Sequence, residues 1–287
     1  MADISALDVK NLREKTGAGI MDCKNALVET GGDFAKAEKL LKEKGLAAVE
    51  KRSGRATKEG KIFVKIKDSG AQGSQAALVE LVSETDFVAK NLEFIALGEK
   101  IADIVLEKGY SEPNDELNGL VMDLAAKIRE NMSLRRIKTV TAKAGEYLTS
   151  YIHDGVIGVV VKFCADKDGA FNSEEVKAFA FTFALHVAAY NPYALDQSKI
   201  DQGWLKEQEE IFRKQTEQDE KMKGKPANVI DNIVKGKVSK FLKEICLMDQ
   251  GYVKDDEKTV AQALADAGKK FGFKISIEDY VYYKVGN

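Results

Sequence analysis

The sequence contains one pattern twice: strand-like runs followed by helices with an apolar stripe. In the first copy, strand-like runs at 61–67 and 75–83 precede a helix that starts at residue 86. In the second copy, runs at 147–153 and 156–163 precede a helix over 173–190. Strands grouped ahead of helices are typical of an α+β fold. We therefore predict a duplicated α+β core in which the two copies share little sequence identity.

An N-terminal module precedes the duplicated core. Residues 1–50 carry apolar positions at helical spacing, and glycines at 17–19 and 31–32 divide them into three short helices. Asp33 is placed as the N-cap of the third helix and Gly45 as its end. Residues 51–61 contain two glycines and no large apolar side chain, which predicts a linker.

The segment 196–245 differs from the duplicated units. Residues 203–223 are rich in charge and poor in apolar positions, and a turn at 224–226 precedes a return helix. Two helices joined so closely form an antiparallel hairpin, and its polar outer half is expected to project from the body. A helix at 259–269 and a strand at 273–285 complete the chain. The predicted division is 1–55, 56–142, 143–195 with 246–287, and the inserted hairpin 196–245.

The charge balance and the cysteines exclude several classes of protein. The 44 basic and 46 acidic residues leave a net charge of −2, too small to attract nucleic acid through a global basic field. Cys23, Cys164 and Cys246 lack CxxC spacing, so buried thiols in a reducing compartment are expected. The N-terminus does not have the pattern of a signal peptide, and the longest apolar stretch, 178–189, is too short to cross a bilayer. We predict a cytoplasmic protein without membrane contact.

No familiar catalytic or nucleotide-binding motif occurs in the sequence. Gly236-Lys237 lacks the remainder of a phosphate-binding loop, and the glycines at 17–19 follow a helix without completing a dinucleotide fingerprint. His186 lies within an apolar helix, which favours a hydrogen-bonded core histidine. His153 ends a strand, where a surface contact and a structural role are equally supported. We predict a binding protein without catalytic residues, a bound metal or direct nucleotide binding.

Residues 84–91, with the sequence ETDFVAKN, begin the helix that follows the second strand-like run. Phe87 can either pack inward with Phe94, seven residues on, or remain exposed as a wedge for a partner; periodicity alone favours the core. For Met21, core packing competes in the same way with a surface role. The run 51–67 holds seven basic residues and one acid, and a solvated linker is favoured over a phosphate contact.

Two stretches resemble the signatures of one family, bacterial elongation factor Ts. Residues 9–27, VKNLREKTGAGIMDCKNAL, are similar to its N-terminal signature, and residues 84–91 are similar to its second signature. Weaker similarities occur at 127–131, at His153 with 157–159, and at 186–189. The likeness extends over nearly the whole chain.

The resemblance implies a fold and a partner. The implied fold has a three-helix module like a ubiquitin-associated domain, a duplicated α+β core with antiparallel sheets and a coiled-coil hairpin. The implied activity is nucleotide exchange on elongation factor Tu, acting on that partner's Mg²⁺ and GDP with no cofactor of its own. Asp86 and Phe87 would enter the partner's G domain, where the aromatic ring disturbs the Mg²⁺ site. The residues implied to contact the partner are Thr85, Asp86, Phe87, Val88, Met21 and His153.

Other interpretations stay open at this point. The N-terminal helices could bind a ubiquitin-like or ribosome-associated partner, and the basic run 51–67 could bind RNA. A homodimer and a 2:2 complex with the partner are both compatible with the sequence. Family members often continue beyond the last strand into a helix that contacts the partner, whereas this sequence ends at 284–287, so no contact is carried over for that helix.

Overall fold

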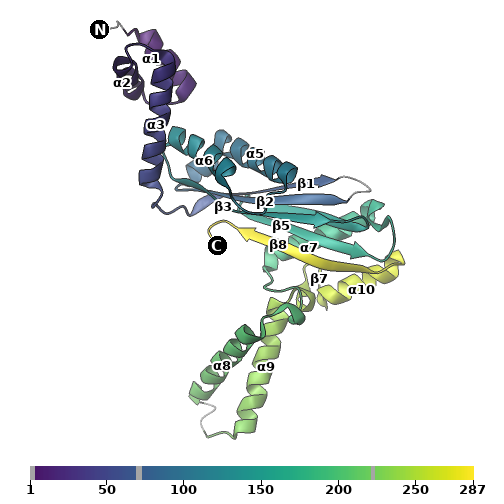
Figure 1. The fold of residues 1–287 in the computed structure, drawn as a ribbon. Helices are drawn as coiled ribbons and strands as arrows, with labels where there is room; N and C mark the ends of the chain where they lie inside the picture. The colour runs from purple at the N-terminus through teal and green to yellow at the C-terminus, as the bar shows by residue number, and fades with distance from the viewer. Residues whose placement is uncertain (1–3, 69–72, 221–223) are drawn as a thin grey trace.

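The computed structural model describes residues 4–68, 73–220 and 224–287. Two antiparallel sheets pack face to face, with helices on both outer faces (Figure 1). The elements of the first half are α1 (Ala6–Thr16), α2 (Ile20–Glu29), α3 (Phe34–Arg52), β1 (Glu59–Asp68), β2 (Ser74–Ser83), α4 (Asp86–Ala89), α5 (Leu92–Lys108), α6 (Asp115–Ile128) and β3 (Met132–Ala142). Those of the second half are β4 (Glu146–His153), β5 (Ile157–Ala165), α7 (Glu174–Tyr190), α8 (Gln202–Gln218), α9 (Ala227–Ile245), β6 (Gly251–Tyr252), β7 (Asp255–Thr259), α10 (Val260–Phe271) and β8 (Ile275–Lys284). Short 3₁₀ turns in the described part of the chain include η2 (Ala170–Asn172), η3 (Gln197–Lys199) and η5 (Leu247–Asp249).

The two sheets repeat one topology, which confirms the α+β prediction. The first has the order β1-β2-β3 and the second β4-β5-β8, and every pairing within them is antiparallel. Each sheet consists of a hairpin and a third strand that arrives after intervening helices. In the second copy, the hairpin of α8 and α9 lies within that crossover, together with the small β6–β7 ribbon that the sequence analysis did not predict.

The two sheets contribute side chains to three apolar layers, because alternate residues of each strand point to opposite faces. On β1, Phe63 packs under α5 while Ile62 faces the second sheet. On β5, Val159 and Val161 face α7 and α10, while Val160 faces the first sheet. Because successive residues of a strand point to opposite faces, a strand covered on both sides reads as a continuous apolar run.

The sheets approach each other closely at Gly158. A Cβ atom at that position would lie 2.3 Å from Ile62 Cγ2, so only glycine allows the two backbones to come so near. The backbone N–H of Ile62 also donates to the carbonyl of Gly155 at 2.7 Å. The hairpin between β4 and β5 is therefore joined directly to β1.

A buried ion pair lies within the layer between the sheets. Glu80 of β2 is fully buried, and its Oε2 accepts from Arg136 Nε at 2.6 Å. Its Oε1 accepts from the backbone N–H of Gly286 at 3.0 Å. The Arg136 guanidinium lies 4.1 Å from the centre of the Tyr283 ring and donates to the Lys284 carbonyl at 3.2 Å. These contacts connect the first sheet to the end of β8.

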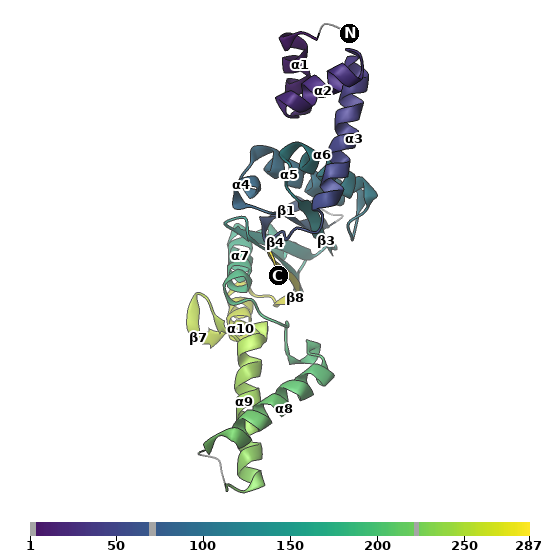
Figure 2. The same cartoon turned by 90° about the vertical axis from the view of Figure 1, so that its left-hand side faces the viewer.

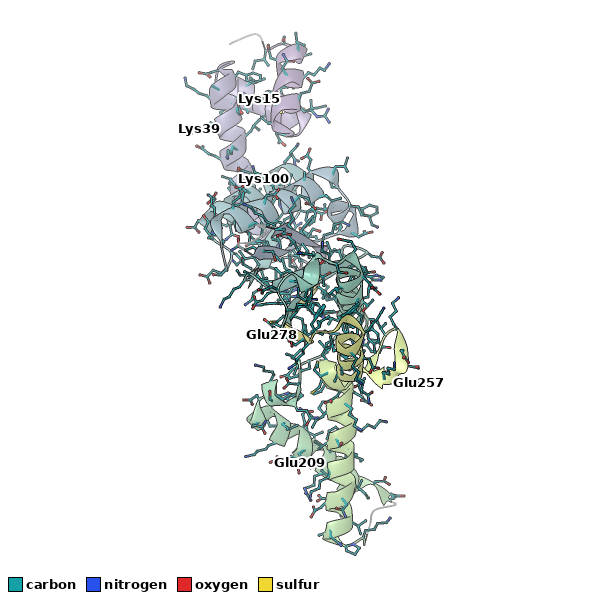
Figure 3. The ribbon with its side chains drawn as sticks, turned by 90° about the vertical axis from the view of Figure 1, so that its right-hand side faces the viewer. Lys15, Lys39, Lys100, Glu209, Glu257 and Glu278 are labelled. Carbon is teal, nitrogen blue, oxygen red and sulfur yellow. The ribbon has the colours of Figure 1, made fainter. Side chains whose placement is uncertain are left out.

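The N-terminal helices and the α8–α9 hairpin lie at opposite ends of the molecule (Figures 1 and 2). Figure 3 shows Lys15 and Lys39 at one end and Glu209 at the other. The hairpin is antiparallel, since Trp204 near the start of α8 packs against Phe241 near the end of α9. It projects from the body as predicted; residues 221–223, which the sequence analysis included in its first helix, lie outside the described residues.

Several sequence predictions need correction. Helix α3 does not end at Gly45 but continues to Arg52, because Val49 packs into the first core and Gly45 allows close contact with Ala126 of α6. The predicted linker at 51–61 is correspondingly shortened to 53–58. Cys164 is only partly buried, in contrast to Cys23 and Cys246. Within the described part of the chain, no helix is both long and apolar enough to cross a membrane.

The core histidine was predicted correctly. His186 is fully buried in α7; its Nε2 lies 3.0 Å from Gln250 Oε1, and its Nδ1 accepts from the backbone N–H of Val253 at 3.2 Å. The second bond requires an unprotonated Nδ1, so the proton is on Nε2. Burial lowers the pKa of His186, against the smaller opposing effect of the bond to Gln250.

This burial makes the stability depend on pH. The unfolded chain, with a histidine pKa near 6.5, binds a proton more readily than the folded state does. The stability contributed by neutral His186 is present above that pH and is lost as the pH falls below it. We expect the loss of unfolding free energy between about pH 7.5 and about 5.5 to be smaller in His186→Gln than in the parent. Urea denaturation at both pH values measures it, with His153→Gln, the exposed histidine, as control; equal losses in all three proteins would contradict the prediction.

Candidate functional site

The segment 84–91 forms a separate turn of helix between β2 and α5. Thr85 is the N-cap of α4, its hydroxyl accepting from the backbone N–H of Val88 at 3.4 Å. Lys90 ends α4, and Asn91 starts a new helix by accepting from the backbone N–H of Glu93 at 2.7 Å. The single helix predicted from Asp86 to 108 is therefore two helices. The interruption changes which residues share a face.

Phe87 is not a core residue. Its side chain is 81 % exposed, whereas Phe94 is fully buried beneath α5 against Phe63. The seven-residue spacing that favoured a shared face does not apply, because the helical phase is reset at Asn91. Val88 and Ala89 do point into the first core. The short helix is thus fixed by one side and presents Phe87 from the other.

Glu130, 45 residues along the chain, braces the turn from below. Its Oε1 accepts from the Thr85 hydroxyl at 2.8 Å, and its Oε2 accepts from the Thr85 backbone N–H at 3.1 Å. Ser83 adds a bond from its hydroxyl to the Thr85 carbonyl at 3.0 Å. The start of α4 is therefore held by several hydrogen bonds to other elements, and Phe87 is presented on a firm support.

Asp86 is ionised and solvent-accessible. Lys90 Nζ donates to its Oδ2 at 2.6 Å, and this hydrogen bond is the main cause that lowers the pKa of Asp86. Both side chains are largely exposed, and exposed pairs of this kind contribute little to stability. The carboxylate can therefore exchange Lys90 for a donor on a partner at low cost.

The structure also exposes apolar residues on the N-terminal helices. Met21 is 63 % exposed, so core packing is wrong for this residue, whereas Cys23 is fully buried as predicted. Asp22, next to Met21, pairs with Arg129 Nη2 at the end of α6. Arg129 directly precedes Glu130, so neighbouring residues of one segment contact both α2 and the Phe87 turn. The sequence analysis noted the similarity at 127–131 without assigning it a role.

His153 lies apart from this group, at the end of β4 in the second sheet. Its imidazole is half exposed and its Nδ1 lies 3.0 Å from the Tyr151 hydroxyl. The Tyr151 ring packs edge-on against Phe181 of α7, which is itself partly exposed. No hydrogen bond or ion pair among the described residues joins His153 to Thr85, Asp86, Phe87 or Val88.

The sequence analysis missed Leu92. It is 82 % exposed at the first position of α5. Ile20, beside Met21, is also exposed. Asn91, a residue type that favours the N-cap position, was the signal that a new helix begins here and that Leu92 lies in its first turn.

The basic run 51–67 does not form one surface. Its residues are distributed over the end of α3, the connection 53–58 and β1. Lys65 Nζ lies 2.6 Å from Asp103 and 3.1 Å from Glu99, and Arg55 pairs with Glu84. Among the described residues, no three His, Cys, Asp or Glu side chains gather so that they could hold a metal ion.

Exposed aromatic and aliphatic side chains beside an ionised carboxylate, on a turn held by several elements, are typical of surfaces that contact another protein. The fold and site thus have the features of a protein-binding factor. The family model described as elongation factor TS matches residues 84–287. Elongation factor Ts of Treponema denticola is 47 % identical over 285 residues, covering 99 % of both chains. That of Clostridium acetobutylicum is 39 % identical over 99 % of this chain and 92 % of its own length. The chain belongs to the elongation factor Ts family.

Proposed function

We propose that this protein is the guanine-nucleotide exchange factor of elongation factor Tu, which binds the GDP form and promotes GDP release during translation elongation. Membership of the elongation factor Ts family supports this function. The observation that carries it is Phe87, a large aromatic side chain held almost fully in solvent on a braced turn. A large aromatic side chain at this position, with Leu92 also exposed five residues on, is suited to burial against a partner.

In this proposal, Phe87 enters the G domain of the partner. Burying a phenylalanine ring is worth about 1.5–3 kcal/mol, which is available to displace elements around the partner's Mg²⁺. Asp86 holds the displaced elements by charge-assisted hydrogen bonds. Thr85 and Val88, which the resemblance implied as partner contacts, instead support Phe87 from within this chain. Thr85 does so through its hydrogen bonds to Glu130, and Val88 through its packing in the first core. Loss of Mg²⁺ weakens the binding of GDP to the partner. By linkage, bound GDP weakens the binding of the exchange factor to the partner by the same factor.

The other predicted contacts and the domain division belong to the same proposal. Met21 contacts the partner near its phosphate-binding side, and His153 contacts a different partner domain. The units proposed are a UBA-like module at 1–55, core halves at 56–142 and at 143–195 with 246–287, and a coiled-coil hairpin at 196–245. The protein carries no cofactor and performs no covalent chemistry; the nucleotide and metal are the partner's. A homodimer and a 2:2 complex are the two assemblies to distinguish.

The competing functions have less support. Binding of RNA through 51–67 is disfavoured by the engagement of Lys65 and Arg55 with carboxylates. A module that acts through the N-terminal helices alone would not require the family match to extend through 84–287.

The proposed function is tested by release of labelled GDP. Substoichiometric amounts of this protein are expected to accelerate loss of fluorescent GDP from elongation factor Tu in the presence of excess unlabelled GDP. Each molecule should act on many partners, since exchange consumes nothing in the factor. Unchanged release at equimolar factor would contradict the proposal. A titration with single-stranded RNA at low and high salt tests the alternative, which requires a steep loss of affinity as salt rises.

A further inference from the structure

The N-terminal helices are carried by α3, which reaches from the module into the core. Helix α3 has 19 residues and is thus about 28 Å long at about 1.5 Å per residue. Its beginning packs with α1 and α2, where Cys23, Leu27 and Ala37 share a small apolar cluster. Its end packs in the first core through Val49. Any rotation of α3 about this lower end is therefore amplified at Met21.

Apolar packing alone does not fix this orientation. A cavity of about 510 Å³ lies between α2, α3 and α6, lined by Ala18, Asn25, Leu41, Ala48 and Ala126 among others. Contacts that cross beside it include the close approach of Gly45 to Ala126, the Lys127 side chain next to Gly17, and the exposed pairs Lys42–Asp123 and Arg129–Asp22. Exposed pairs are worth little individually. The orientation of the module therefore depends also on what holds the end of α3.

Asn131 holds that end. It is a buried polar residue, and its Nδ2 donates to the Ser53 carbonyl at 3.1 Å and to the Arg55 carbonyl at 2.7 Å. Its backbone N–H donates to Glu84 Oε1 at 2.6 Å, and Arg55 Nη1 lies 3.4 Å from the same oxygen. We call these contacts the Asn131 clamp. Glu84 directly precedes Thr85, so one residue joins the end of α3 to the turn that carries Phe87.

We propose that Asn131 is a positioning residue whose clamp fixes the N-terminal module and Phe87 in one frame, so that Met21 and Phe87 meet the partner at a set separation. The proposal rests on the exchange function proposed above but concerns geometry within this chain. A preformed spacing spares the partner the cost of ordering two independent surfaces. Without the clamp, a rotation of about 10° over the length of α3 displaces the module by about 5 Å.

Distance measurement in the free protein tests the clamp directly. Spin labels at Lys39→Cys and Lys100→Cys report on α3 and α5, whose exposed positions are visible in Figure 3. Cys164→Ser removes the partly buried thiol. In Asn131→Ala, the distribution of distances between the labels is expected to broaden by several ångströms relative to the parent. Thr149→Ala, which removes an equally buried polar side chain from the second sheet, is expected to leave the distribution narrow.

The partner supplies the second readout. With the clamp intact, the losses of affinity for the partner from Met21→Ala and Phe87→Ala are expected to be coupled, so that the loss in the double variant differs from the sum of the two single losses. In the Asn131→Ala background, the coupling is expected to disappear and exchange to slow about tenfold. If the wild-type protein does not accelerate GDP release from elongation factor Tu, the exchange function is refuted, while the distance test remains valid.

A narrow distribution in Asn131→Ala would overturn the positioning role. If circular dichroism shows that Asn131→Ala is unfolded, Glu84→Ala decides instead, because it removes the acceptor for the Asn131 backbone from a side chain that is 21 % exposed. Broadening in that variant supports the clamp, and an unchanged distribution refutes it.

Discussion

Replacing Phe87 by alanine is expected to slow GDP release from elongation factor Tu by about 30-fold or more while leaving the fold intact. Loss of an aromatic residue that is buried at the centre of an interface costs about 2 kcal/mol or more, and 1.4 kcal/mol is a factor of ten. The free protein loses almost nothing, because the ring is 81 % exposed before the partner binds. Stopped-flow release of fluorescent GDP measures the rate, and urea denaturation measures stability.

Phe94 provides the matched control for this experiment. It is the same residue type, seven positions along the chain, but is fully buried. Phe94→Ala is expected to lower the unfolding free energy by about 3–5 kcal/mol through loss of packing and creation of a cavity. Phe87→Ala should therefore lower the exchange rate without loss of stability, whereas Phe94→Ala should lower the stability. The hypothesis that Phe87 acts as a wedge would be refuted if Phe87→Ala unfolded the protein. It would also be refuted if this variant accelerated GDP release from elongation factor Tu as fast as the parent does.

Replacing Arg136 by leucine is expected to cost about 3–5 kcal/mol of stability, because it leaves the Glu80 carboxylate fully buried without its main partner. Glu80→Leu should cost less, since the guanidinium that remains is about one third exposed and can be hydrated. The double variant should be more stable than the sum of the single losses predicts, because it leaves neither charge alone.

The measurement is urea denaturation of all three variants at neutral pH. Arg135→Leu is the control; its guanidinium lies 3.8 Å from Glu80 and is 40 % exposed, so a loss below about 1 kcal/mol is expected. Equal losses for Arg136→Leu and Glu80→Leu would refute the asymmetry. Strict additivity in the double variant would show that the pair does not act as a unit.

The sequence was sufficient to predict the α+β class, the two strand–helix copies and the projecting hairpin, because these depend on local periodicity. It failed where long-range packing decides. Glycine is a common helix end, yet α3 continues through Gly45 because Ala126 approaches there and Val49 is buried beyond it. Nothing within α3 itself announces either contact.

The contact residues show a similar division. The resemblance to a family singled out Asp86 and Phe87, whereas periodicity favoured burial of Phe87 because it assumed one unbroken helix. The cap at Asn91 decides the matter, and this signal was present in the sequence. The support from Glu130 and Asn131 was beyond local reasoning, since its hydrogen bonds join residues that are 45 or more positions apart.

The inserted hairpin has a consequence for how the second sheet is assembled. Strand β5 pairs with β8, which is made much later in the chain, and closing the long loop between the two strands costs chain entropy. The two ends of the hairpin are held together, with the Tyr193 N–H donating to the Ile245 carbonyl at 2.8 Å and the Leu247 N–H to the Ala194 carbonyl at 2.9 Å. Contacts within α8 and α9 are close in sequence and can form early during synthesis. Once formed, the hairpin removes about fifty residues from the loop that must close when β8 pairs with β5. The hairpin therefore lowers the entropy cost of the pairing that completes the second sheet.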